Sequence, residues 1–197
     1  MKELFVATRN HGKLKELRQL LSGLVETVSC AADFPDFPET VEDGSTFEEN
    51  ALKKAREAML YSGLPALADD SGLVVDALDG RPGVYSARFA GEDAGDTANN
   101  QRLLKEMSDV PREQRRAAFV CALAFVTPDG CEQLFSGRVA GLMLDGERGG
   151  GGFGYDPLFL VEGFDRTMAE LSLDEKNVVS HRAQALRKFR EFLDQGR

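Results

Sequence analysis

Two adjacent carboxylates and a hydroxyl interrupt an apolar stretch at residues 66–73, whose sequence is ALADDSGL. Asp69 and Asp70 follow a run that is typical of a buried strand, so we expect them where that strand ends. Neighbouring carboxylates repel each other, and holding both ionised calls for a metal ion, a shared proton or a basic partner. Because Asp-Ser-Gly is also ordinary turn composition, these residues alone leave an active site and a polar turn equally open.

The start of the chain predicts a strand, a polar loop and a helix in direct succession. An apolar run at residues 4–7 indicates the strand, Thr8 and Asn10 belong to the loop, and leucines spaced for one helical face follow over residues 13–24. The N-terminus of such a helix presents unpaired amides, so an anion could bind there with Lys13 at the entrance. A plain turn with a solvent-facing lysine is the open alternative.

A second helix is predicted over residues 47–61, because the sequence TFEE at 46–49 matches a capping box. Asn50 and Lys54 are four residues apart and can share a face of this helix. Taken alone, Lys54 is an ordinary surface lysine. The acidic loop at residues 33–44 is either a solvated turn or an arm that binds a metal.

The second half of the chain supplies the remaining strands and a glycine-rich segment. Residues 117–126 are continuously apolar and predict a central strand, and residues 132–143 would pair with it antiparallel, which makes the sheet mixed. The sequence GGGGFGYDP at 149–157 resembles a linker in its glycines. Linkers seldom carry Phe and Tyr at this spacing, and a strand resumes at Leu158, so we expect an ordered loop beside a ligand.

His181 and Arg182 follow Ser180, which can cap the last helix. Cations are electrostatically unfavourable in the first turn of a helix unless an anion or an acceptor-rich group lies there too. This position favours a functional role for the pair over mere exposure.

Composition limits the class of protein. The chain has 197 residues, enough for one sizeable domain over residues 1–197, and 33 acidic against 24 basic residues give a net charge of -9. This charge argues against a duplex-binding or membrane-surface protein. The absence of a membrane-length apolar run and of a signal-peptide pattern predicts a cytoplasmic protein. Without a CxxC pair, Cys30, Cys121 and Cys131 are expected to be reduced, mostly core thiols.

In order and spacing, these motifs resemble the inosine/xanthosine triphosphate pyrophosphatases, enzymes that hydrolyse deaminated purine nucleoside triphosphates to monophosphate and pyrophosphate. The similarity runs essentially from end to end. Arg9, where a small residue is common, and the extra glycines at 149–151 depart from the family pattern. The matching segments are TxNxxK at 8–13, the region 42–55, ADDSGL at 68–73, PGVYSAR at 82–88, GFGYDP at 152–157, EK at 175–176 and SHR at 180–182.

The resemblance implies an α/β fold with a long mixed sheet flanked by helices, in two lobes with a nucleotide cleft between them. It also implies a homodimer and Mg²⁺-dependent hydrolysis of ITP, dITP and XTP, with water attacking the α-phosphorus and pyrophosphate leaving. The partner is then a small-molecule nucleoside triphosphate, with neither a nucleic acid nor a membrane as ligand.

The family's residue roles fall into a phosphate group and a base group. Glu42 and Asp70 would bind Mg²⁺, with Asp69 close enough to assist, and Asp70 would also orient or deprotonate the attacking water. The phosphates would be held by Lys13, Lys54, Thr8 and Asn10, with Ser71 beside the metal. The base would be bound by Phe153, which can stack on the purine, by Gly154 and Tyr155, and by Asp156, Lys176, His181 and Arg182 at its edge. Donors there would pair with the 6-oxo group and leave the 6-amino group of adenine unpaired.

Two other functions stay open. A septum-inhibitor type of pyrophosphatase, which takes pyrimidine or modified nucleotides, has a similar fold, but the SHR and FGYD motifs argue against it. A nucleotide- or RNA-binding module without turnover would have no need of adjacent Asp69 and Asp70, and RNA binding fits poorly with the net charge of -9.

Overall fold

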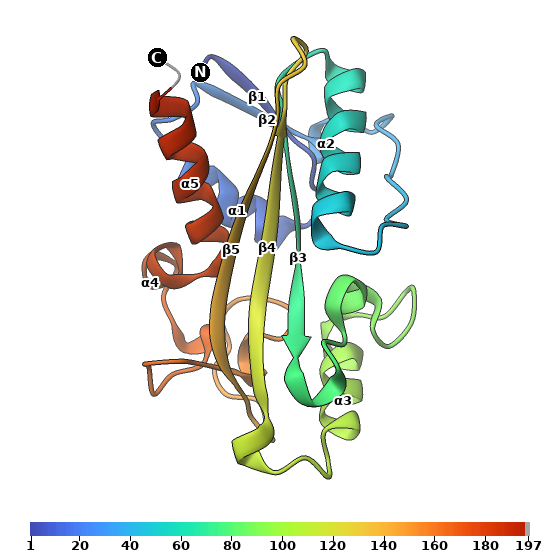
Figure 1. The fold of residues 1–197 in the computed structure, drawn as a ribbon, viewed down its shortest axis with the longest axis vertical. Helices are drawn as coiled ribbons and strands as arrows, with labels where there is room; N and C mark the ends of the chain where they lie inside the picture. The colour runs from blue at the N-terminus through green and yellow to red at the C-terminus, as the bar shows by residue number, and fades with distance from the viewer. Residues whose placement is uncertain (196–197) are drawn as a thin grey trace. The chain divides into compact units, whose positions relative to one another are not determined.

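The computed structural model describes residues 1–195 and shows a six-stranded sheet with helices, in the order β2-β1-β3-β4-β5-β6 (Figure 1). β1 pairs in parallel with β2 and β3, whereas β5 and β6 are antiparallel, so the predicted α/β class with a mixed sheet is confirmed. The strands are β1 (Glu3–Val6), β2 (Thr27–Cys30), β3 (Ala66–Val75), β4 (Arg116–Val126), β5 (Glu132–Met143) and β6 (Phe159–Val161). The α-helices are α1 (His11–Leu21), α2 (Phe47–Ser62), α3 (Asp96–Glu106), α4 (Leu173–Val179) and α5 (His181–Gln195).

The chain divides into two compact units, each built from several segments. Unit 1 contains residues 1–70, 121–137 and the chain from Arg182 onward, and unit 2 contains residues 71–120 and 138–181. Strands β3, β4 and β5 contribute residues to both units, so neither unit is a contiguous piece of sequence. A single domain over residues 1–197 stays a prediction, and so do the two lobes. Residues 196 and 197 lie outside the described residues.

In unit 1, alternate residues of each strand enter different cores. Leu4 and Val6 of β1 pack with leucines of α1 and with α5, whereas Phe5 packs with alanines of α2. Figure 1 shows α1 and α5 on one side of these strands and α2 on the other. The same two-residue period in β3 places Leu67 with α1 and α5 and Ala68 with α2.

Unit 2 has its own apolar core around the ends of three long strands. Leu73 and Val75 of β3 are fully buried in it together with side chains from α3, β4 and β6. The ring of Phe119 lies 4.5 Å from that of Phe159 and 5.1 Å from the imidazole of His181. This core fixes the part of the chain from which the glycine-rich loop projects.

The expected strand end at Asp69 and Asp70 is wrong. β3 continues to Val75, so the two carboxylates lie in the middle of a ten-residue strand. The strand continues because Leu73 and Val75 enter the core of unit 2, and because both carboxylates are paired with cations.

The helix predictions held with small shifts at the ends. α1 begins at His11 with Asn10 as its N-cap and ends at Leu21, not over residues 13–24. The capping box at Thr46 is present, and α2 ends at a left-handed Gly63. Within residues 1–195, none of the helices combines the length and apolar character that spanning a membrane requires. Cys30 and Cys121 are buried free thiols, as expected.

Candidate active site

Asp70 lies on the sheet face that α2 covers, and two side chains of α2 contact its carboxylate. Lys54 Nζ lies 2.9 Å from Oδ1, and Asn50 Nδ2 donates to Oδ2 at 3.2 Å. The same Lys54 ammonium lies 2.7 Å from Glu42 Oε1. Asn50 and Lys54 reach Asp70 together because residues four apart share a face of a helix, as the sequence spacing indicated. One cation therefore joins the two carboxylates that were predicted to bind metal.

Burial and charge act on this cluster in opposite directions. Burial raises the pKa of Asp70 above its ordinary value, and the nearby ammonium groups of Lys54 and Lys13 offset this only in part. Burial alone would lower the pKa of Lys54, but Asp70 and Glu42 outweigh it and raise that pKa. Lys54 is therefore firmly protonated, while Asp70 is a stronger base than an exposed aspartate.

The donor set suits a hard divalent cation. Glu42 and Asp70 already converge on one positive group, the ammonium of Lys54, and carboxylate oxygens are ligands that Mg²⁺ prefers. Within residues 1–195, no group of three or more His, Cys, Asp or Glu side chains could hold a metal ion by itself. Two carboxylates are compatible with an ion such as Mg²⁺, which commonly takes its other ligands from water and substrate phosphates.

Asp69 lies two residues after Leu67 in β3, so its side chain is on the same face of the sheet. Its carboxylate bonds to side chains of α1, α5 and β4. Lys13 Nζ lies 2.6 Å from Oδ1, Arg182 Nε lies 2.9 Å from Oδ2, and the Cys121 thiol donates to Oδ2 at 3.1 Å. Arg182 also pairs with Glu16, and the side chain of Asp69 is fully buried. In these ion pairs, Lys13 and Arg182 bind the carboxylate of Asp69, whereas Lys54 binds that of Asp70.

The charge states in this buried network are set by its pairs. Burial alone would lower the pKa of Arg182, but Asp69 and Glu16 raise it well above the ordinary value. Burial, and then the adjacent Asp69, raise the pKa of the Cys121 thiol well above its usual range, so the thiol is a neutral donor. Lys13, Arg182 and the neutral Cys121 thiol all donate to the Asp69 carboxylate.

The other predicted phosphate contacts lie next to these carboxylates in sequence or structure. Asn10 Oδ1 accepts from the Lys13 N–H at 2.9 Å and so caps α1. The buried Thr8 accepts from the Asn10 N–H at 3.2 Å. Ser71 follows Asp70 directly in β3 and is half-buried.

The glycine-rich loop forms a second group of predicted site residues, which lies in unit 2. Asp156 Oδ2 accepts from the Phe153 N–H at 3.2 Å and from Lys176 Nζ at 2.6 Å, and both charged side chains are buried. Gly152 has a φ of +79°, and a Cβ there would lie 2.0 Å from Asp156 Oδ2 and 2.3 Å from Lys176 Nζ. Glycine is therefore required at residue 152. The loop has defined internal contacts, and its place beside a ligand stays a prediction.

Three predicted purine contacts are engaged within the protein. Tyr155 is buried, its hydroxyl donates to the Ser86 carbonyl at 2.9 Å, and burial raises its pKa. The imidazole of His181 stacks on Phe119. Arg182 is buried and already donates to Asp69 and Glu16.

Sequence reasoning missed several residues that hold the predicted ones. Asn50 had a signal, since a polar side chain four residues before Lys54 shares its helical face, but no role was assigned to it. The other contacts join residues far apart in the chain, for which the sequence carried no local signal. These residues are Glu16, Asp96, Asn100 and Cys121.

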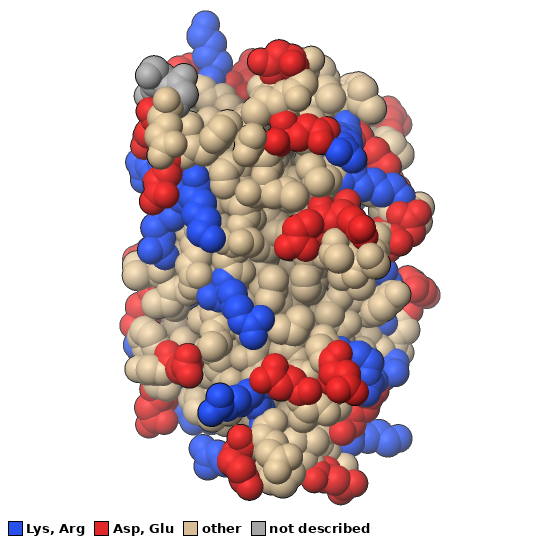
Figure 2. Space-filling model, viewed as in Figure 1, with Lys and Arg blue, Asp and Glu red and all other residues tan. Residues whose placement is uncertain are grey.

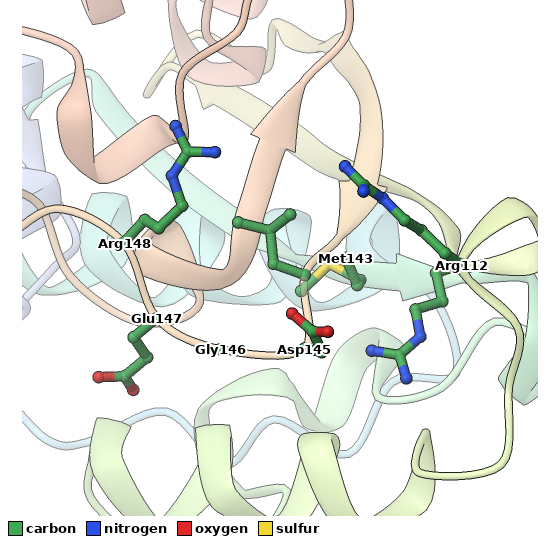
Figure 3. Close-up of a pocket in the computed structure, with 8 residues that line it drawn as sticks. Arg112, Met143, Asp145, Gly146, Glu147 and Arg148 are labelled. Carbon is green, nitrogen blue, oxygen red and sulfur yellow. The ribbon is translucent and has the colours of Figure 1, made fainter.

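A pocket of about 490 Å³ in unit 2 has none of the predicted site residues in its lining. Figure 3 shows Arg112, Asp145, Glu147 and Arg148 around it, and no predicted site residue is part of its lining. Arg148 is already paired with Glu170 at 3.0 Å. The pocket therefore has mixed charge and is not the site that the motifs indicate.

The chain is similar over nearly its whole length to proteins of one family. A family model described as Ham1 family matches residues 4–192. A dITP/XTP pyrophosphatase of Geobacter sulfurreducens is 60% identical over 193 residues, covering 98% of this chain and 97% of that protein. The solved structure of the Staphylococcus aureus Ham1 protein matches with a TM-score of 0.88 at 41% identity, covering 99% of this chain and 100% of that one. A nucleoside-triphosphatase / dITP/XTP pyrophosphatase from Mycobacterium abscessus matches with a TM-score of 0.77 at 48% identity, covering 95% and 98%.

Proposed function

The chain belongs to the Ham1 family, and from this premise we propose that it hydrolyses deaminated purine nucleoside triphosphates to the monophosphate and pyrophosphate. The resemblance read from the motifs is thereby confirmed at the level of the family. The proposed substrates are ITP, dITP and XTP. The observation that carries the proposal is the cluster of Asp70, Lys54 and Glu42, which combines a carboxylate of raised pKa with a buried ammonium and a second carboxylate.

In the proposed reaction Asp70 accepts a proton from the water that attacks the α-phosphorus, and pyrophosphate leaves. Its raised pKa suits a general base, because proton affinity rises with pKa. Lys54 and Lys13 neutralise charge on the phosphates, while Thr8, Asn10 and Ser71 donate hydrogen bonds. Glu42 and Asp70 would hold Mg²⁺, which supplies further positive charge to the phosphates when bound.

Asp69 has a different task in this proposal, because its bonds fix Lys13. The carboxylate binds Lys13 on one oxygen and Arg182 on the other, and Glu16 binds the far side of Arg182. Positioning a phosphate-binding lysine through a buried pair keeps its ammonium in one place before substrate arrives.

Base selection is proposed to lie with the residues of unit 2 and the start of α5. Phe153 would stack on the purine, with Gly154 and Tyr155 shaping the loop. Donors at the base edge would favour a 6-oxo group, since adenine's 6-amino group would then lack an acceptor. The proposed edge residues are Asp156, Lys176, His181 and Arg182.

The remaining proposals concern the setting of the enzyme. We propose a small-molecule substrate, with no nucleic acid or membrane as partner, because the net charge is -9. Figure 2 shows lysine and arginine side chains interspersed with aspartate and glutamate on the face in view. A cytoplasmic location is proposed from the sequence, and a homodimer from the family resemblance.

Pyrophosphate release from ITP, XTP, GTP, ATP and dTTP, with and without Mg²⁺, tests the proposal. We expect Mg²⁺-dependent pyrophosphate from ITP and XTP and far slower release from the other three. Inorganic phosphate without pyrophosphate would overturn it. A preference for dTTP would support the septum-inhibitor type, and binding without product would support a non-catalytic module.

A further inference from the structure

The backbone around Phe153 is held by three side chains at three consecutive peptide groups. Asp156 Oδ2 accepts from the Phe153 N–H at 3.2 Å, and Asp96 Oδ2 accepts from the Gly154 N–H at 2.7 Å. Asn100 Nδ2 then donates to the Gly154 carbonyl at 3.2 Å. Both peptides that flank Phe153 are thus fixed, and so is the one that follows.

Two of these three side chains come from one face of α3. Asp96 and Asn100 are four residues apart, so they lie about one helical turn from each other and grip Gly154 at its N–H and its C=O. Asn100 is buried, and its Nδ2 also donates to Glu147 Oε1 at 2.9 Å, which sets the orientation of the amide. The helix therefore acts as a rigid support for the loop.

The loop requires such a support because glycines flank Phe153. Gly152 and Gly154 have φ values of +79° and +60°, and glycine has the widest choice of backbone conformations of any residue. Without bonds to its peptides, the chain on either side of Phe153 could rotate and turn the ring. Gly152 is confined by the buried pair of Asp156 and Lys176, whereas Gly154 is confined from α3.

We propose that Asp96 and Asn100 are positioning residues that determine base specificity by fixing the orientation of the Phe153 ring. This inference rests on the proposed function, in which Phe153 stacks on the purine. Neither residue touches the base, and they act through the Gly154 peptide. Asp96 carries the test, because its side chain is exposed and its replacement leaves the apolar core intact.

Three variants separate the hydrogen bond from other effects of Asp96. Asp96→Ala removes the acceptor, and Asp96→Asn removes the charge but keeps an oxygen that can accept from the Gly154 N–H. Asp93→Ala removes an exposed acid three residues earlier and serves as the matched control. Equilibrium binding of inosine monophosphate and of pyrophosphate is measured by calorimetry, because only the first ligand has a base.

Asp96→Ala is expected to weaken binding of inosine monophosphate about fivefold or more, because base–aromatic stacking contributes on the order of 1–3 kcal/mol. Pyrophosphate binding should stay within about twofold, and Asp96→Asn and Asp93→Ala should resemble the wild type. In turnover, Asp96→Ala should raise KM for ITP more than it lowers kcat and reduce the ITP to GTP preference. The Gly154 amide should exchange its hydrogen faster in Asp96→Ala, with or without nucleotide.

Equal weakening of both ligands in Asp96→Ala would overturn the proposal, since that is the result of a general structural role. So would unchanged inosine monophosphate binding with unchanged exchange at Gly154, or an Asp96→Asn variant as weak as Asp96→Ala. A wild type that releases no pyrophosphate from ITP would contradict the proposed function itself. This result needs only the wild-type protein. If the wild type cleaves ITP but has the same affinities for inosine monophosphate and pyrophosphate as Asp96→Ala, only the inference is contradicted.

Discussion

The charged cluster of unit 1 and the glycine loop of unit 2 are held in place by opposite means. In unit 1 the groups proposed for chemistry are side chains, among them Asp70 on a strand and Lys54 on a helix, and ion pairs such as Lys54 with Asp70 position them. In unit 2 the backbone around Phe153 is positioned, and side chains such as Asp96 serve it. Substitutions in the cluster should therefore change charge and rate, whereas those at the loop should change geometry and selectivity.

Within unit 1 the strand period explains how two adjacent aspartates do different work. Asp69 bonds to Lys13 and Arg182 on one face of β3, and Asp70 bonds to Lys54 on the other. A one-residue shift in register would exchange these environments. The two aspartates are therefore adjacent in sequence but have different surroundings on opposite faces of the strand.

Asp70→Asn is expected to have the largest effect on the cluster. Loss of the base and of a metal carboxylate should lower kcat/KM for ITP by about 10³-fold or more, since general base catalysis alone contributes roughly 10²–10⁴-fold. Steady-state pyrophosphate release measures this, with Asp76→Asn, an exposed aspartate just after β3, as control. Near-normal turnover would remove Asp70 from the role of base.

Lys54→Met should lower kcat/KM on the order of 10²-fold and should also destabilise the metal-free protein. Asp70 and Glu42 would lose their shared cation, and an uncompensated buried charge is strongly destabilising. Added Mg²⁺ should then raise the Tm of the variant more than that of the wild type. Lys53→Met, which breaks an exposed pair with Asp43, is the control, and an equal response of both variants to Mg²⁺ would contradict the prediction.

Phe153→Ala tests the loop directly and should act on binding of the base. Loss of stacking is expected to lower kcat/KM for ITP about tenfold, mainly through KM, since one base–aromatic stack contributes roughly 1–3 kcal/mol. The same substitution at the partly exposed Phe164 should leave the kinetics unchanged. A drop in kcat with an unaltered KM would place Phe153 in the charge chemistry and so blur the contrast between the two regions.

The pH dependence should show the smallest change. Burial raises the pKa of Asp70, so the carboxylate loses its proton later than an exposed aspartate, whose pKa is about 3.9. Activity should fall as the pH falls through this raised value, and Lys54→Met should move the acid limb to still higher pH by removing a cation that lowers the pKa. A profile of kcat/KM against pH, compared with Lys53→Met, checks the direction. An acid limb that keeps its position or moves to lower pH in Lys54→Met contradicts the prediction.

The sequence carried the signals that are local in the chain. The capping box at Thr46 located α2, and four-residue spacing put Asn50 and Lys54 on one face. The strand was predicted to end at Asp69 and Asp70 because two adjacent charges are typical of a strand boundary. The apolar pattern resumes beyond them at Leu73 and Val75, and the strand continues.

Long-range pairs could not be predicted in this way. The partners of Arg182 are Asp69, 113 residues away, and Glu16, 166 residues away. Nothing in the spacing near the end of the chain indicates either of them. The same holds for Asp96, whose acceptor role depends on a loop 58 residues later.

Hydrolysis of ITP in ¹⁸O-labelled water tests the central claim most directly, because the label marks the phosphorus that the water attacks. If Asp70 delivers water to the α-phosphorus, one labelled oxygen should enter inosine monophosphate and none should enter pyrophosphate. Label in pyrophosphate, or in free inorganic phosphate, would show attack at another phosphorus and contradict the account.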